Sequence, residues 1–258
     1  MMIGRRSIIG LSLLCALLLS AIGVANASAA GTTAFTCKPK SPTGGVGFSD
    51  EHCTNEVFEG ATFEHASIGE NVATKFAGTN NVTGSETSLA ILKGTLAGVA
   101  VELSATGVKT EGTITNKTVS KVMQNVGEGI TVTYTGVKVT KPAGLGCTVP
   151  GETLTTKSLK STTIEGTGAT ATGVKLEPTT GTTFIEIPIE GCAVKGTFPV
   201  TGSAVGTPAG ATLKFTPEST TGLKFGGNTA SLENTLTIRM APNGSEPTNP
   251  IVYTTTEP

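Results

Sequence analysis

The side chains that most often carry catalysis are scarce in this 258-residue chain and gather in one short stretch. Asp50 is the only aspartate, and His52 and His65 are the only histidines. A triad needs a nucleophile, a histidine base and a carboxylate that orients the base. The nearest serine, Ser49, has no Gly-x-Ser-x-Gly elbow around it. A hydrolase that uses Asp50, His52 and His65 is therefore kept as one alternative function.

The same stretch also holds Cys53 and several glutamates, but their spacing does not suit a metal centre. The two histidines lie more than ten residues apart, whereas zinc sites on helices place two histidines about four residues apart. Cysteines of exported proteins are usually disulfide-bonded rather than metallated. The sequence predicts no metal and no cofactor, and we expect a protein that is not an enzyme.

The N-terminus has the three zones of a cleavable secretory signal, over residues 1–27. Arg5 and Arg6 precede an apolar, leucine-rich run at 8–24, and Ala25-Asn26-Ala27 supplies the small residues of a cleavage site. The run is short for a membrane span, which needs about 20 residues. We expect cleavage after Ala27, no membrane span after removal of the signal, and a secreted location, extracellular or at the cell surface. An uncleaved N-terminal anchor is the alternative.

Composition limits the partners that the mature chain can have. The formal net charge is -1, the pI is about 6.2 and only 14% of the residues are charged. Nucleic-acid binding requires a basic patch, so the sequence predicts no nucleic-acid partner. The chain has no Trp and two Tyr, which argues against an aromatic platform for sugars. An extracellular protein or surface partner remains open.

Apolar residues alternate with polar ones in several short segments, which is typical of strands with one buried face. Gly, Pro and Asn turns separate these segments, and helical periodicity is almost absent after the signal. We therefore predict an all-β protein, an antiparallel β-sandwich of Greek-key or jelly-roll-like type, with a closed β-barrel as the alternative. The clearest segments are 99–103, 130–135, 185–189, 211–215 and 232–240.

The mature chain divides into a disulfide-pinned N-terminal section at 28–85 and a β-sandwich domain at 86–258. Four cysteines follow the signal, an even number that suits two bridges in an exported chain. Cys37 and Cys53 bracket the section with fewest clean strands, where a staple is most needed. Cys147 and Cys192 each follow a Gly at the end of a strand-like run. We predict the pairs Cys37–Cys53 and Cys147–Cys192.

The tetrapeptide Thr-Gly-Val-Lys occurs three times, with its glycine at Gly107, Gly136 and Gly173. The apolar alternation changes parity across each glycine, which one extra residue in a strand would explain. We therefore predict β-bulges with positive φ at these glycines. The alternative is that each Thr-Gly is a turn that opens a new strand.

Residues from about 90 to 240 resemble a group of uncharacterised secreted β-rich bacterial proteins. The resemblance implies export, β structure and the Gly-Cys positions, and it implies no activity. It rests on Val132–Pro150 (VTYTGVKVTKPAGLGCTVP), Thr182–Gly202 (TTFIEIPIEGCAVKGTFPVTG) and Leu223–Ile238 (LKFGGNTASLENTLTI).

Three functions are compatible with these patterns. The first is a secreted, non-catalytic structural or binding protein. The second is an extracellular β-barrel that carries a small apolar ligand, which would need small inward residues on several strands. Because the inward residues are mostly large, the sequence predicts a filled core. The third is the hydrolase described above, which requires its three residues to converge in one pocket.

Overall fold

The structure is a computed structural model, and its described part begins at residue 33. The predicted signal and the cleavage site at Ala27 therefore lie outside the described residues. The described ranges are 33–53, 55–81, 89–119, 122–165, 172–209, 212–220, 222–240 and 249–254. Gly31–Pro258 form one compact unit, which includes both the N-terminal section and the predicted β-sandwich domain.

The elements are strands joined by short turns and two 3-10 turns, so the all-β class is confirmed. Their bounds are β1 Thr33–Pro39, β2 Gly47–Phe48, β3 Glu56–Val57, β4 Phe63–Ser67, β5 Thr74–Asn81, β6 Ala90–Leu96, β7 Val99–Ala105, β8 Gly107–Val119, β9 Val122–Thr135, β10 Lys138–Lys141, η1 Pro150–Glu152, β11 Thr153–Thr155, β12 Leu159–Glu165, β13 Thr172–Pro178, β14 Thr183–Ile189, β15 Gly196–Gly202, β16 Ala204–Ala209, β17 Thr212–Phe215, η2 Pro217–Thr220, β18 Leu223–Phe225, β19 Asn228–Thr229, β20 Ser231–Thr237, β21 Arg239–Met240 and β22 Asn249–Thr254.

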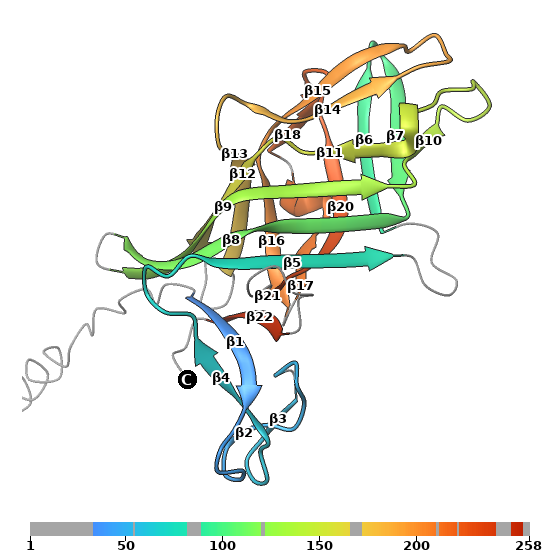
Figure 1. The fold of residues 1–258 in the computed structure, drawn as a ribbon. Helices are drawn as coiled ribbons and strands as arrows, with labels where there is room; N and C mark the ends of the chain where they lie inside the picture. Colours follow the sequence, from blue (N-terminus) through green and yellow to red (C-terminus); the bar gives the residue numbers. More distant parts are fainter. Residues whose placement is uncertain are drawn as a thin grey trace, which may run out of the picture. The chain divides into compact units, whose positions relative to one another are not determined.

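The described strands form one sheet of 18 strands and a second sheet of four, β14-β15-β18-β19. The strand pairings within both sheets are antiparallel, and the long β8 and β9 run side by side with β5 (Figure 1). The large sheet curls strongly into a half-barrel and does not close. The antiparallel all-β prediction is therefore confirmed, while the described strands close neither into the predicted sandwich nor into the alternative barrel.

The period-two alternation explains why these segments are strands and how they bury their core. On β9, Ile130, Val132 and Tyr134 are buried, while Thr131 and Thr133 between them are partly exposed. The same pattern buries Ile187 of β14 and the other inward residues of the small sheet. The two sheets share one continuous hydrophobic core, so burial on each strand face stabilises the packing of both.

The first two Thr-Gly repeats lie opposite each other at the point where β8 begins and its partner β9 ends. Gly107 begins β8 directly after β7, and Gly136 follows the end of β9. A Cβ atom on Gly107 would collide with the hydroxyl oxygen of Thr135, and one on Gly136 with that of Thr106. Each threonine therefore packs on the glycine of the other repeat, and glycine is required for this close approach.

The predicted backbone angle is correct at one of the three glycines. Gly136 has φ +60°, but Gly107 and Gly173 do not have positive φ, so the prediction is wrong there. Their lack of a side chain serves close packing instead, at Gly173 against Val205. A positive-φ glycine inside β9 is Gly129 (φ +61°), beside the register shift between Glu111 and Thr113. The bulge therefore lies at a position outside the repeats.

Both predicted disulfides are formed. The Cα atoms of Cys37 and Cys53 are 5.7 Å apart, and those of Cys147 and Cys192 are 4.9 Å apart. Gly146 and Gly191, which precede the second pair, both have positive φ, and a Cβ on Gly191 would lie 2.5 Å from the carbonyl oxygen of Gly146. The two glycines thus let the backbones approach closely enough for the bridge.

The N-terminal strands β1–β4 belong to the large sheet through the pairing of β1 with β22; they also have a small core of their own, and a buried amide holds them to β8. Cys37 and Cys53 pack with Phe48 and Phe63, separately from the main core. Asn116 of β8 is fully buried: its Oδ1 accepts the Ala34 N–H (2.9 Å), and its Nδ2 is within bonding distance of two carbonyl oxygens of the N-terminal section. β5 also falls within the predicted N-terminal section at 28–85, but it pairs with β8 along its whole length.

Candidate functional site

Asp50, the sole aspartate, holds the backbone of its own loop. It lies in the connection between β2 and β3. Its Oδ1 accepts the backbone N–H of His52 (2.9 Å), and its Oδ2 accepts the backbone N–H of Asn55 (2.7 Å). Both carboxylate oxygens are thus engaged by backbone donors, which is the Asx-turn role of a loop aspartate.

His65 is a packing residue between aromatic rings. Its ring centroid lies 5.8 Å from that of Phe35 and 4.5 Å from that of Phe48, next to the Cys37–Cys53 bridge. Its Nε2 is buried and has no hydrogen-bond partner among the described residues. Burial lowers the pKa of His65, against the attraction of the Glu56 carboxylate. The fold therefore favours the neutral imidazole.

The alternative of a hydrolase requires Asp50, His52 and His65 to converge in one pocket, and these positions do not support it. His52 pairs through Nε2 with Glu51 at 3.6 Å, and its Nδ1 has no hydrogen-bond partner within the described residues. The interior cavity and the groove described below include neither histidine and not Asp50. Over the described ranges, no three His, Cys, Asp or Glu side chains are placed to hold a metal ion. In the same ranges, no helix is long and apolar enough to cross a membrane.

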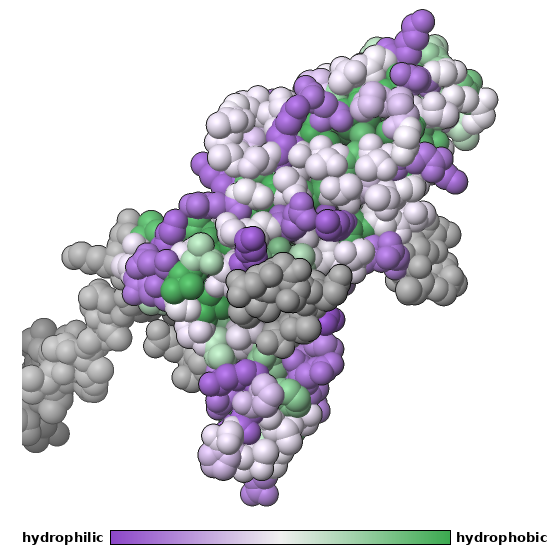
Figure 2. All heavy atoms as spheres, in the orientation of Figure 1, coloured by the Kyte–Doolittle hydropathy of each residue, from purple (hydrophilic) through white to green (hydrophobic). Residues whose placement is uncertain are grey.

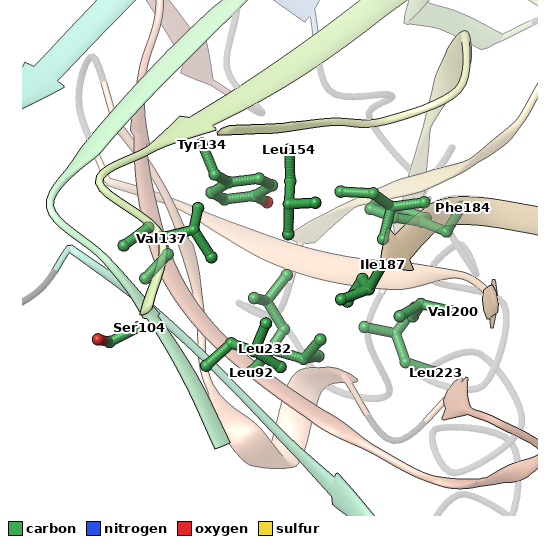
Figure 3. A pocket seen from close by; sticks show the side chains of 14 residues that line it. Leu92, Ser104, Tyr134, Val137, Leu154, Phe184, Ile187, Val200, Leu223 and Leu232 are labelled. Atoms are coloured by element: carbon green, nitrogen blue, oxygen red, sulfur yellow. The ribbon is translucent and has the colours of Figure 1, made fainter. Parts of the chain in front are cut away.

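An apolar cavity of about 50 Å³ lies inside the main core (Figure 3). Leu92 of β6, Leu154 of β11, and Phe184 and Ile187 of β14 point into it, and Tyr134 contributes its ring. Ligand pockets are typically about 300–1,000 Å³, so this cavity is far below the size of a carried ligand. It is a gap in a filled core, as the large inward residues predict.

Tyr134 connects this cavity to a buried amide on β20. Asn234 is 3% exposed, and its Nδ2 donates to the Tyr134 hydroxyl at 3.3 Å. Burial of the phenol raises its pKa, although the hydrogen bond from Asn234 acts in the opposite direction. Oδ1 of Asn234 has no partner among the described residues. A buried acceptor without a donor is costly in a folded protein, which makes this residue notable.

A second hollow, of about 810 Å³, is a groove on the surface of the main sheet. We call it the β20 groove. It is lined by residues 79–81 at the end of β5, Leu89 beside β6, residues 214–218 of β17 and η2, and residues 233–235 of β20. The side chains in it are mainly amides, hydroxyls and charged groups, with Leu89, Phe215 and Pro217 as the apolar part.

Two hydrogen-bonded contacts hold the walls of the β20 groove to β20. On one side, Asn80 Nδ2 donates to the Thr235 carbonyl oxygen at 3.0 Å. On the other side, Thr220 is fully buried; its hydroxyl accepts the Leu232 N–H at 2.8 Å and lies 3.1 Å from the Leu232 carbonyl oxygen. The groove is therefore built by fixed elements rather than by free loops.

Most of the exposed surface elsewhere is polar strand surface. Figure 2 shows a face dominated by hydrophilic and neutral residues, with hydrophobic residues visible mainly in recesses between them. Exposed Lys–Glu pairs such as Lys157–Glu186 (2.7 Å) occur on this surface. Such pairs contribute little to stability because water screens them, so they describe a solvated scaffold.

The fold and its hollows define the chain as an antiparallel all-β protein with two disulfides and a preformed polar groove. No known protein family, no curated protein and no solved structure matches the chain.

Proposed function

We propose that this chain is a secreted, non-catalytic binding or structural protein that works outside the cell or at its surface. The proposal rests on the structural roles of Asp50 and His65, two of the few side chains in the chain that could carry catalysis. Both oxygens of Asp50 hold backbone amides of its own loop, and His65 is packed between two phenylalanine rings. These groups serve the structure of the disulfide-pinned section, and the His52–Glu51 pair (3.6 Å) lies in neither of the two hollows.

Two further features support an extracellular role. The two disulfides are typical of oxidising compartments, and the secretory signal that the sequence predicts in residues 1–27 would supply a route to one. The apolar-ligand alternative receives less support, because the interior cavity of about 50 Å³ is smaller than known ligand pockets.

Expression of the full chain in a bacterial secretion host tests the export part. We expect the protein outside the cytoplasm, with a mature N-terminus at Ser28 by intact-mass spectrometry. A protein that stays in the cytoplasm and begins at Met1 would contradict export.

The non-catalytic part is tested with the purified protein and ester, peptide and glycoside substrates. Wild type and the triple variant Asp50→Asn/His52→Ala/His65→Ala should show the same background turnover. Turnover by the wild type that the triple variant loses, while its circular dichroism is unchanged, would show that the protein is an enzyme.

A further inference from the structure

We propose that the β20 groove is a carbohydrate-binding site for an uncharged oligosaccharide. The inference rests on the proposed function, because it names the ligand class of a binding protein. Its volume of about 810 Å³ lies within the usual range of small-molecule sites, about 300–1,000 Å³, and is much larger than the interior cavity.

The chemistry of the lining suits hydroxyl groups. A sugar hydroxyl both donates and accepts hydrogen bonds, so it is best matched by amides, hydroxyls and carboxylates side by side. The groove offers these groups from three separate segments of the chain. They are Thr79, Asn80, Asn81, Thr216, Glu218, Glu233 and Thr235.

The charge of the groove favours a neutral ligand over an anionic one. Glu218 and Glu233 are exposed carboxylates, and Lys214 is the cation that lines the groove with them. The pKa of Glu218 is lowered, chiefly by a hydrogen bond from its own backbone amide and also by Thr216, so it is ionised at neutral pH. A net negative groove repels phosphates and nucleic acid, while carboxylates bind sugar hydroxyls well as charge-assisted acceptors.

The groove recognises a sugar without an aromatic platform. Tryptophan is absent from the chain, and Phe215 is 2% exposed. The sugar ring therefore does not stack on an exposed aromatic side chain of the groove. The apolar part of the lining, Leu89 and Pro217 together with Phe215, offers limited contact for the C–H face of a sugar. Hydrogen bonds from fixed walls must therefore supply most of the specificity.

Pre-organisation gives these hydrogen bonds their value. The Asn80–Thr235 bond joins residues 155 positions apart, and Thr220 fixes η2 against β20. A ligand that enters the groove meets walls that are already in place, so little ordering entropy is lost on binding.

Asn234 forms part of the floor of the groove, with its side chain directed to the core side of β20, where it contacts Tyr134. It lines the groove, it is 3% exposed, and its Oδ1 has no donor among the described residues.

Isothermal titration of the purified mature protein with neutral oligosaccharides tests the proposal. The probes are the hexasaccharides of cellulose, chitin, xylan and starch, each checked at the same time for release of reducing ends. We expect one or more of them to bind with a Kd of about 1 mM or tighter, without cleavage. No binding by any probe at higher concentrations would overturn the carbohydrate site and leave the proposed export and lack of catalysis standing.

Variants then locate the site. Asn81→Ala and Glu233→Gln, both at exposed positions in the groove, should each weaken binding about tenfold, as expected for the loss of a hydrogen bond to the ligand. Glu111→Gln is the matched control, because Glu111 is an exposed strand glutamate paired with Lys109 (2.9 Å) and does not line the groove. Equal binding by all variants would overturn the proposed location. Binding followed by cleavage would support the site and contradict the non-catalytic function.

Discussion

Two buried asparagines face each other across β8 and β9, and replacing each by leucine should change the stability of the protein in opposite directions. Asn116 and Asn125 are cross-strand partners, and both are fully buried. Asn116 makes hydrogen bonds to Ala34 and Ile68. Neither polar atom of the Asn125 side chain has a partner among the described residues. The pair therefore separates the effect of hydrogen bonding from that of position.

Asn116→Leu should destabilise the protein by about 2–4 kcal/mol. The Ala34 N–H loses its side-chain acceptor, and an unsatisfied buried donor costs about 1–3 kcal/mol. The carbonyl oxygens of Ala34 and Ile68 each lose one donor, at about 1 kcal/mol each, because other donors remain close to both. The apolar leucine returns about 1 kcal/mol through burial.

Asn125→Leu should instead stabilise the protein by about 1–2 kcal/mol, because it removes a buried amide that has no hydrogen-bond partner among the described residues. Both substitutions place the same side chain in the same layer of the sheet, so a steric penalty would affect both in the same direction. Equilibrium unfolding in guanidinium chloride measures the two changes. Limited proteolysis should also cut the N-terminal strands of Asn116→Leu faster than those of wild type. Equal destabilisation by the two variants would refute the assignment of their hydrogen bonds.

Three further outcomes are expected. Because the folded-state pKa of His65 is lowered, stability should fall as the pH drops below the unfolded value of about 6.5, and His65→Gln should lose less stability than wild type between pH 7.5 and 5.0 in thermal melts. Replacing Cys147 and Cys192 together with alanine should cost about 4 kcal/mol for a bridge that spans 45 residues, measured by chemical unfolding, and a loss below about 1 kcal/mol would contradict the entropic account. Gly107→Ala should destabilise the protein by about 1–3 kcal/mol through overpacking, because the new methyl group would meet the Thr135 hydroxyl. Adding Thr135→Ala should restore much of that loss, and a double variant that is as unstable as Gly107→Ala would argue against this contact.

The strands were predictable because burial on one face imposes a period of two on the sequence. Ile130, Val132 and Tyr134 are buried as their alternation requires. Pro188 cannot donate a hydrogen bond to a neighbouring strand, and it lies on β14, the terminal strand of its sheet. The disulfide partners followed from an even cysteine count and two matching Gly-Cys contexts.

The role of the Thr-Gly repeats was only partly predictable. Local parity correctly indicated a break at Gly107 and Gly136, where one strand begins and another ends, but Gly173 lies inside the continuous strand β13. Parity also could not distinguish a bulge from a corner where the chain changes partners. The reciprocal packing of Thr106 on Gly136 and of Thr135 on Gly107 joins two repeats that are 29 positions apart, from Gly107 to Gly136. Such a contact depends on strand pairing, which local patterns do not specify.

Burial also decides what a short motif can mean. Asn116-Lys117-Thr118 reads as a glycosylation sequon, but the Asn116 amide is buried and bound to the N-terminal section. A glycan on that nitrogen is incompatible with these bonds in the folded protein. The sequon at Asn81 starts at an exposed residue, and it lies in the β20 groove.

The β20 groove could not be found from the sequence, because its lining comes from segments near positions 80, 216 and 234. Each segment alone carries ordinary Asn, Thr and Glu residues: the first ends β5, the second follows β17, and the third is the middle of β20. The strand order brings them together: β20 pairs with both β17 and β6, and Asn80 joins β5 to it. A polar site made in this way leaves no motif, so its chemistry is visible only after the sheet is assembled.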